Sequence, residues 1–330
     1  MLHFICTFVV LSSIASGCAA LGLQCNELIE RLENMAAGSL EHAAVLARAQ
    51  SGCGPALDRA ALAAIYHSTN GDSWRHNEGW LTGRPHCSDW YGIGCDDKGR
   101  VQYLILDHNL LTGPIPSQIG FLANLHYLHL HNNRLTTIPS EVGNLSNLRE
   151  LCLGFNRLSG SIPPEIGRLT ELRNLILGHN RLNGSIPSEI GDLANLRHLY
   201  LNDNDLSGPI PPEIDRLRHL QNLILERNEL SGPIPPEIGT MAELRHLYLG
   251  FNQLDGRIPS EIGNLSNLLH LLLDGNRLSG HIPSEIGELA ALRILLLHDN
   301  DMSLCLPIGL LEWADKLFGF TPPPGGLYFG

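Results

Sequence analysis

The chain has 330 residues, of which 43% are hydrophobic and 17% are charged. This composition is typical of a globular protein and excludes a chain that is disordered throughout. Aspartate and glutamate number 34 against 22 lysines and arginines, which gives a formal net charge of −12. Because an acidic surface repels phosphate groups, the charge argues against a nucleic-acid partner and against docking on an anionic membrane.

Residues 1–20 have the features of a secretory signal peptide. They contain no charged side chain, and an apolar stretch over 4–11 is followed by small residues. We therefore expect cleavage between residues 17 and 20, and a secreted protein. The alternative is an uncleaved segment that attaches the chain to a membrane, although its apolar stretch is short for a span of about 20 residues. We expect no membrane span beyond this segment.

Residues 21–56 are expected to form a helical extension before the main body of the chain. Two stretches, 26–32 and 39–47, have helical periodicity, and Ser39 is placed to cap the second. We expect a disulfide between Cys25 and Cys53 that ties these helices together in an oxidising compartment. Exchange of partners with Cys87 or Cys95 is an open alternative.

Residues 57–100 are expected to cap the repeats that follow, since a stack of repeats exposes its apolar core at each end. The stretch 57–66 has helical periodicity and leads to the turn signal Asn70-Gly71. Trp74 and Trp80 come next, followed by the motif Cys87-Ser-Asp-Trp-Tyr-Gly-Ile-Gly-Cys95.

Residues 101–310 consist of one pattern that occurs nine times, as in Leu148-x-x-Leu-x-Leu-x-x-Asn-x-Leu158. The pattern begins at Val101, Leu125, Leu148, Leu172, Leu196, Leu220, Leu244, Leu268 and Leu292. All intervals are 24 residues except one of 23, from 125 to 148. Alternating leucines predict a short strand with one apolar face, which a single strand cannot bury. Stacked copies bury these faces in one continuous core.

Each repeat has an asparagine in the same place. These residues are Asn109, Asn133, Asn156, Asn180, Asn204, Asn228, Asn252, Asn276 and Asn300. Because a side-chain amide both donates and accepts hydrogen bonds, stacked asparagines are expected to satisfy backbone groups where each strand bends. The Ile-Pro that follows predicts a second extended segment, and Pro-Glu-Ile-Gly predicts a short helical or 3₁₀ turn that ends near the glycine.

With these residues, the array resembles the plant-type leucine-rich repeat, L-x-x-L-x-L-x-x-N-x-L-x-G-x-I-P-x-x-I-G-x-L-x-x. The resemblance implies an α/β solenoid, a right-handed superhelix with a parallel β-sheet on its concave side and a helical N-terminal cap. The motif 87–95 resembles the family's Cys-x-Trp-x-Gly-Val-x-Cys, with one extra residue before Trp90 and with Ile93 in place of valine. By this resemblance we expect a disulfide between Cys87 and Cys95.

Residues 311–330 are expected to form a C-terminal cap and tail. The stretch 312–318 is a plausible amphipathic helix over the last repeat, and the proline-rich stretch 321–326 is expected to be extended. The family's paired cysteines are missing here, because only Cys305 is present. Cys152 lies six repeats away, about 30 Å by strand spacing, which is too far for a disulfide within the chain.

The positions between the leucines are expected to face the concave side and to align in columns. The column between the two strand leucines is mostly apolar or aromatic, and Phe155 and Phe251 follow strands. Such a surface favours partner binding, although a plain preference of these residue types for strands is the alternative. The partner-binding residues that we predict are Tyr103, Tyr127, His129, Ile176, Tyr200, Ile224, Tyr248 and Phe251.

Nine of the 16 histidines fall in or next to these strands. His129 and His131 are two apart on one strand, near Cys152 and Asp107 on neighbouring turns, and these are ligand types for a divalent metal. The spacing matches no closed metal site, so we predict neither a metal nor a cofactor. The histidines instead suggest that partner affinity changes between about pH 5 and 7.5, with solvated imidazoles of no special role as the alternative.

No enzyme signature is present in the sequence: it has no P-loop, G-x-S-x-G, H-E-x-x-H or kinase motif. One glutamate per repeat after the proline pair is interpreted as a solvated or arginine-paired row, rather than as acid–base groups. Asn-x-Ser sequons mark Asn144, Asn183 and Asn264 as glycan acceptors, with chance as the alternative.

The sequence thus predicts a secreted, non-enzymatic binding protein that recognises a partner on its concave face. A protein partner is expected and a glycan is possible, and the oligomeric state is left open. The resemblance implies recognition roles like those of receptor-like ectodomains, co-receptors and polygalacturonase-inhibiting proteins. The alternatives are a structural, cell-surface or ice-binding protein, and a metal-dependent enzyme built around His129 and His131.

Overall fold

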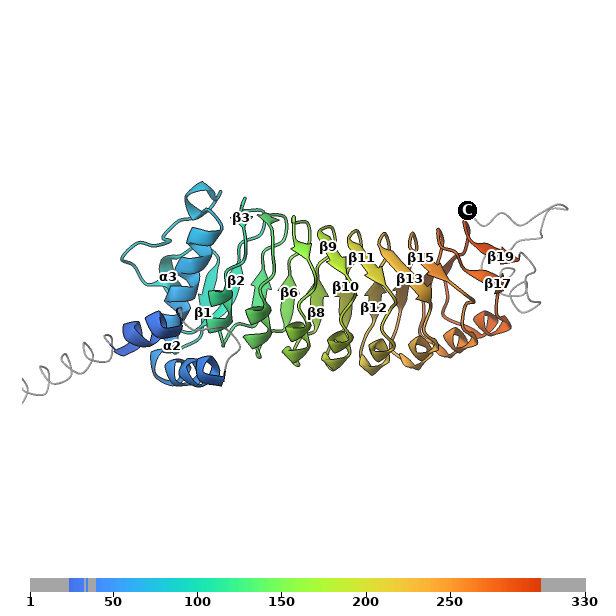
Figure 1. The fold of residues 1–330 in the computed structure, drawn as a ribbon, viewed down its shortest axis with the longest axis horizontal. Helices are drawn as coiled ribbons and strands as arrows, with labels where there is room; N and C mark the ends of the chain where they lie inside the picture. The colour runs from blue at the N-terminus through green and yellow to red at the C-terminus, as the bar shows by residue number, and fades with distance from the viewer. Residues whose placement is uncertain (1–23, 33, 35–39, 304–330) are drawn as a thin grey trace, which may run out of the picture.

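The structure is a computed structural model that describes residues 24–32, 34 and 40–303. The predicted signal peptide, Ser39, Cys305 and the segment 311–330 lie outside the described residues. In Figure 1 the repeats are stacked in a row, with the N-terminal helices at one end and the short helical turns along one long side. Among the described residues, no helix combines the length and apolar character that crossing a bilayer requires.

The N-terminal part contains a helix over residues 24–32 and the longer helix α2 (Leu40–Ser68). The sequence predicts separate helices over 39–47 and 57–66, but α2 runs through both with a kink at Cys53, where φ is −119° and ψ is 21°. Pro55 is tolerated because it falls in the first turn after the kink, where its missing N–H is not needed. A disulfide joins Cys53 to Cys25.

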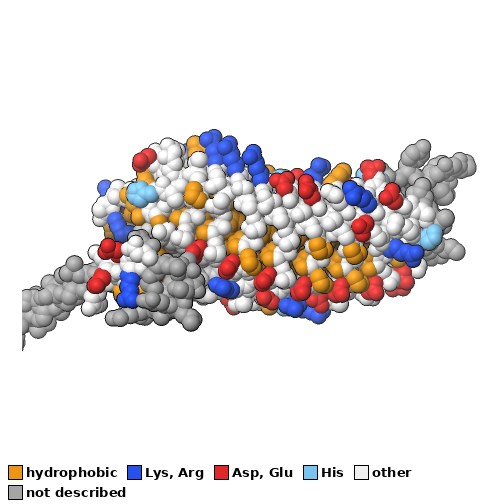
Figure 2. Space-filling model, in the orientation of Figure 1, with side chains coloured by type: hydrophobic (Ala, Val, Ile, Leu, Met, Phe, Trp, Pro, Cys, Tyr) orange, Lys and Arg blue, Asp and Glu red, His pale blue; other side chains and the backbone are white. Residues whose placement is uncertain are grey.

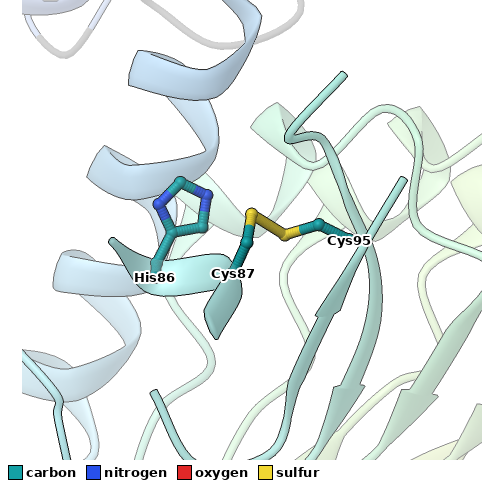
Figure 3. A group of neighbouring side chains, drawn as sticks. All are labelled: His86, Cys87 and Cys95. Carbon is teal, nitrogen blue, oxygen red and sulfur yellow. A yellow bond between two sulfur atoms is a disulfide. The ribbon is translucent and has the colours of Figure 1, made fainter. Parts of the chain in front are cut away.

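The second half of α2 packs on an aromatic cluster in the cap. Ring centroids are 5.2 Å apart between Tyr66 and Trp74, 4.8 Å between Trp74 and Trp80, and 5.0 Å between Trp80 and Trp90. The three tryptophans are buried. They come from the chain around η1 (Gly71–Ser73) and α3 (His86–Asp89), and the second disulfide, Cys87–Cys95, ties α3 to strand β1 (Ile93–Cys95). Figure 3 shows this disulfide beside His86.

A buried ion pair connects the cap to the first repeat. Arg100 donates from Nε to Oδ2 of Asp58 at 2.9 Å and from Nη2 to Oδ1 at 3.1 Å. The backbone N–H of Val101 also donates to Oδ2 of Asp58, at 2.8 Å. Asp58 is fully buried in α2, so its carboxylate depends on these three donors for its stability.

The main sheet has ten strands in the order β1-β2-β4-β6-β8-β10-β12-β14-β16-β18, antiparallel between β1 and β2 and parallel elsewhere. After β1 its strands are β2 (Val101–Ile105), β4 (Tyr127–His129), β6 (Glu150–Cys152), β8 (Asn174–Ile176), β10 (His198–Tyr200), β12 (Asn222–Ile224), β14 (His246–Tyr248), β16 (His270–Leu272) and β18 (Ile294–Leu296). Equivalent residues pair directly: Leu199 is the register partner of both Leu175 and Leu223. The columns that the repeat predicts are therefore confirmed.

The returning half of each repeat contains shorter strands and a 3₁₀ turn. A five-stranded sheet consists of β7 (Ser159–Gly160), β9 (Arg181–Gly184), β11 (Asp205–Gly208), β13 (Glu229–Pro233) and β15 (Gln253–Asp255). The remaining strands pair as β3 (Thr112–Gly113) with β5 (Arg134–Leu135), and as β17 (Ser279–His281) with β19 (Asp301–Ser303). The turns are η2 (Ser117–Phe121), η3 (Ser140–Asn144), η4 (Pro164–Arg168), η5 (Ser188–Asp192), η6 (Pro212–Arg216), η7 (Pro236–Thr240), η8 (Ser260–Asn264) and η9 (Ser284–Glu288).

The 3₁₀ turns carry the repeated glutamates. Acidic side chains line the lower edge of the array in Figure 2, beside a band of hydrophobic side chains. Among the described residues, none of the ion pairs joins these glutamates to an arginine. Four of them, Glu141, Glu189, Glu261 and Glu285, lie within hydrogen-bond distance of the hydroxyl of the preceding serine. The row is thus solvated rather than arginine-paired.

The core of the array is a single cluster of leucines and isoleucines that continues from the cap to the last described repeat. The asparagines stabilise it as predicted. Asn204, for example, donates to the carbonyl oxygens of Leu177 and Leu201 at 3.2 and 3.0 Å, and accepts from the N–H of Leu182 at 3.0 Å. From Asn133 on, each asparagine bonds its own repeat to the previous one, whereas Asn109 bonds the first repeat to His76 of the cap. The predicted α/β solenoid is confirmed.

Candidate functional site

A hollow of about 500 Å³ lies over the outer face of the main sheet, which we call the concave face. Strands β8, β10, β12 and β14 and the turns after β6 and β8 surround it. Its lining consists of Gly154, Phe155, Ile176, Gly178, His179, Tyr200, Asn202, Asn222, Ile224, Glu226, His246 and Tyr248. The hollow thus lies near the middle of the array.

Two glycines explain why the surface is hollowed here. The position just after the second strand leucine carries Asp107, His131, Gly154, Gly178, Asn202, Glu226, Gly250, Asp274 and His298 in successive repeats. Only at Gly154 and Gly178 do two adjacent repeats both lack a side chain at this position. A Cβ at Gly178 would lie 2.5 Å from Oδ1 of Asn202, so a side chain there would require the Asn202 side chain to move.

Aromatic rings form one wall of the hollow. Phe155 is 53% exposed, and its ring stacks on that of His179 with centroids 4.0 Å apart and an interplanar angle of 21°. Both residues have left-handed backbone conformations, φ 55° and 57°, at the bend that follows each strand. The bend sets the two rings side by side on adjacent repeats.

Hydrogen bonds fix the two tyrosines of the hollow. Asn222 donates from Nδ2 to the hydroxyl of Tyr200 at 2.8 Å and lies 3.0 Å from Nδ1 of His198. The hydroxyl of Tyr248 lies 2.8 Å from Nδ1 of His270, and the two rings stack with centroids 6.1 Å apart. Rings held in this way lose little conformational freedom when a ligand packs against them.

The strand ends bring carboxylates to the hollow. Glu226 is half-buried there, and its side-chain carboxylate makes no hydrogen bond or ion pair with any described residue. Burial, and then the nearby carboxylate of Asp203, raise the pKa of Glu226 above its ordinary value. Asp203 accepts a hydrogen bond from Nδ2 of Asn202 at 2.7 Å and lies 3.4 Å from Nδ1 of His179 and 3.9 Å from Nε of Arg227.

Four of the eight predicted partner-binding residues line the hollow: Ile176, Tyr200, Ile224 and Tyr248. Ile224 is only 6% exposed, because it lies between its register partners Tyr200 and Tyr248 and forms part of the floor. The other predicted residues lie elsewhere on the array.

Those four outlying residues each have neighbours of their own. Tyr103 and Tyr127 stack on each other with centroids 5.0 Å apart near the cap. His129 lies beside Glu150, and Phe251 is 44% exposed under the guanidinium of Arg227, which lies 4.6 Å from its ring centroid.

Several residues of the hollow were not among the eight predicted partner-binding residues, namely Phe155, His179, Asn202, Asn222, Glu226 and His246. The glycines at 154 and 178 were the available signal, since only there do two adjacent repeats both lack a side chain just after the second strand leucine.

Two groups of described residues bring potential metal ligands together. In the group of His86, Cys87 and Cys95, the two sulfurs form a disulfide and cannot act as thiolate ligands (Figure 3). In the group of His129, Glu150 and Cys152, the ligand atoms lie within 4.8 Å of one another.

The second group has no free thiolate. Burial, followed by Glu150 and Asp107, raises the pKa of the Cys152 thiol to about 12, so the sulfur is protonated at neutral pH. Nε2 of His129 lies 3.0 Å from Oε2 of Glu150, whereas Nδ1 of His131 lies 2.7 Å from Oδ1 of Asp107. The two histidines that the sequence suggested as joint ligands thus have separate carboxylate partners.

Fold and site together define a repeat solenoid with an aromatic and acidic hollow on its parallel sheet. A family model described as leucine-rich repeat region matches residues 100–202 and 178–317, and the chain belongs to this family. The LRR receptor-like serine/threonine-protein kinase FEI 2 of Arabidopsis thaliana is 42% identical over 57 residues, which are 17% of this chain and 10% of that relative.

Two solved structures share the fold. The LRR ectodomain of the plant membrane receptor kinase GASSHO1/SCHENGEN3 from Arabidopsis thaliana, in complex with CASPARIAN STRIP INTEGRITY FACTOR 2, has a TM-score of 0.73 and 38% identity, covering 77% of this chain and 31% of that chain. A plant ice-binding protein has a TM-score of 0.63 and 28% identity, and the match covers 77% of this chain and 89% of that chain. The chain therefore spans about a tenth of the curated relative and under a third of the receptor ectodomain.

Proposed function

We propose that the chain is a secreted, non-enzymatic recognition protein that binds an extended segment of a protein partner in the hollow of its concave face. The observation that carries this proposal is the hollow itself, in which Tyr200 and Tyr248 are oriented by hydrogen bonds around an apolar floor. Tyrosines of this kind are enriched where proteins bind, since they offer a large apolar area and a hydroxyl.

The fold supports the proposal. The similar receptor ectodomain was solved in complex with CASPARIAN STRIP INTEGRITY FACTOR 2, so a solenoid of this family binds another molecule. In our proposal Tyr103, Tyr127, His129 and Phe251 contact flanking parts of the partner. A glycan is the second class of partner that the surface can accept.

The sequons are compatible with a free concave face. Asn144 lies in η3, Asn183 in β9 and Asn264 in η8, and none of them is in the main sheet. Glycans attached there would leave the hollow open.

The test is affinity capture with the secreted chain, followed by binding measurements on variants. Replacing Tyr200 and Tyr248 together by alanine is expected to reduce partner affinity by at least about tenfold, because hot-spot tyrosines contribute more than about 1 kcal/mol each. Tyr91→Ala, an exposed tyrosine of the cap, serves as the matched control and is expected to leave affinity unchanged. Equal affinity of the double variant and the wild type would contradict the proposal.

The similar plant ice-binding protein favours a second candidate function, because this chain covers 89% of its length. Ice binding requires a flat, regular surface, whereas the concave face is hollowed and mixes tyrosine, histidine and carboxylates. An ice-recrystallisation assay separates the two functions: we expect no inhibition by the purified chain, and inhibition at micromolar concentration would favour the ice-binding role.

A further inference from the structure

The hollow has negative groups but no cation of its own. Among the described residues that line it, Glu226 is acidic and none is lysine or arginine. Asp203 lies close to Glu226, and the buried Asp274 also acts on it electrostatically. The carboxylate of Glu226 is half-buried and has no hydrogen-bonding partner among the described residues. A carboxylate in this state is stabilised by any donor that a ligand brings.

The nearest cations have other partners. The Arg227 guanidinium lies over the ring of Phe251, with its Nε 3.9 Å from Asp203. His179 stacks on Phe155 and lies 3.4 Å from Asp203, while His298 lies 3.7 Å from Asp274. None of these groups bonds to Glu226, so its charge is available to a ligand.

The charge across the main sheet is arranged by strand direction. Arg173, Arg197 and Arg245 directly precede β8, β10 and β14, whereas Asp203 and Glu226 follow β10 and β12. Because the strands are parallel, all strand starts lie at one edge and all strand ends at the other. These arginines therefore lie where the strands begin, whereas Asp203 and Glu226 lie where they end, together with Arg227.

Aromatic rings and a carboxylate together favour a guanidinium over an ammonium group. A guanidinium is planar, stacks on tyrosine and phenylalanine rings, and donates two parallel hydrogen bonds to one carboxylate. An ammonium group is more strongly hydrated and interacts mainly as a point charge. Tyr200 and Tyr248 lie in the same hollow as Glu226, and burial, followed by Glu226 and Tyr200, raises the pKa of Tyr248.

We propose that the hollow is an arginine-binding subsite, in which an arginine of the partner's bound segment donates to Glu226 and packs against Tyr200 and Tyr248. Asp203 supplies the second negative charge. This inference rests on the proposed function, since it assumes that a peptide segment occupies the concave face.

The test uses a library of random twelve-residue peptides displayed on phage, selected on the full chain. Wild type is compared with Glu226→Gln, which removes the charge at constant shape, and with Glu229→Gln, an exposed glutamate of β13 that serves as the matched control. Peptides selected on wild type and on Glu229→Gln are expected to be enriched in arginine several-fold over the unselected library, and more than in lysine. The enrichment is expected to disappear on Glu226→Gln.

A second measurement uses the best selected peptide, with its arginine replaced by citrulline, which has the same shape and no charge. Citrulline is expected to weaken binding to wild type by about ten- to a hundredfold, the range for a hydrogen bond between charged groups, and to change binding to Glu226→Gln little. Thermal unfolding tests whether Glu226→Gln is folded. If Glu226→Gln does not fold, Asp203→Asn is used in its place.

The outcomes separate the subsite from the proposed function. Peptides that require Tyr200 and Tyr248 but show no arginine enrichment, or equal enrichment in lysine, would overturn the arginine subsite and leave the binding face intact. If no selected peptide depends on the two tyrosines, both the subsite and the proposed function are wrong.

Discussion

The N-terminal cap and the repeat array are stabilised in different ways. The cap is held by contacts that are not repeated along the chain, namely two disulfides, a cluster of three tryptophans and the Asp58–Arg100 ion pair. In the array, the same leucine packing and asparagine hydrogen bonds recur in every repeat. Because the interior of the array is uniform, its concave face is free to vary, and the hollow lies where two adjacent repeats have glycine after the strand.

The largest effect is expected from Asp58→Ala in the cap. The change leaves Arg100 unpaired in a largely buried place and removes the acceptor of the Val101 N–H. Breaking a buried ion pair in this way costs about 3–5 kcal/mol of the free energy of unfolding, which urea denaturation measures. Asp97→Ala, at an exposed position of the same cap, is the control and is expected to change little. A loss below about 1 kcal/mol would show that the cap does not depend on single contacts.

Leu199→Ala tests the interior of the array at a residue that is fully buried. Loss of a buried leucine side chain is expected to lower the free energy of unfolding by about 2–5 kcal/mol. Its neighbour Tyr200 faces the hollow, so Tyr200→Ala is expected to cost less than about 1 kcal/mol. Similar losses for the two variants would mean that the tyrosine belongs to the core and not to a binding surface.

The asparagine hydrogen bonds are expected to contribute less per residue. Asn204→Ala leaves the N–H of Leu182 without its acceptor and removes one of the two asparagine donors to the carbonyl oxygens of Leu177 and Leu201. A loss of about 1–3 kcal/mol follows from the buried N–H that stays unsatisfied. The matched control is Asn202→Ala, which removes an amide from the concave face, and thermal unfolding of the two variants compares them. If the two variants had the same melting temperature, the asparagine row would not stabilise the stack of repeats.

The smallest effect is a pH dependence of binding. The raised pKa of Glu226 means that its charge is lost at a higher pH than that of an ordinary glutamate. Affinity for the arginine peptide is therefore expected to fall from pH 7 towards pH 5. The groups that face Glu226 are Asp203, Arg227, Asp274 and His179.

Titration calorimetry of wild type and Glu226→Gln over this range checks the prediction. The affinity of the variant is expected to depend less on pH than that of wild type. Equal pH dependence of the two affinities would mean that groups other than Glu226 cause it. Burial lowers the pKa of His198, His246 and His270, so these histidines contribute less above pH 5 than the sequence suggested.

The repeats could be predicted from the sequence because the constant spacing fixes both the strand and its register. Leu175, Leu199 and Leu223 pair as the 24-residue interval requires. The two helical stretches on either side of Pro55 were predicted, but their union in one kinked helix was not, since a proline at the start of a helix looks in sequence like a break between two.

The site could be predicted only in part. Periodicity identifies which residues face the concave side, but it cannot show that Ile224 lies beneath its neighbours or that the carboxylate of Glu226 bonds to no described residue. Both facts depend on side chains from adjacent repeats. The glycines at 154 and 178 are visible in the sequence, yet their effect appears only once the repeats are stacked in register.

The most direct test of the account is side-chain oxidation footprinting of the chain with and without its captured partner. The account predicts that Phe155, Tyr200 and Tyr248 are protected by the partner, while the exposed Tyr91 of the cap reacts equally in both states. Protection of the cap or of the returning strands, with the residues of the hollow unchanged, would contradict recognition on the concave face.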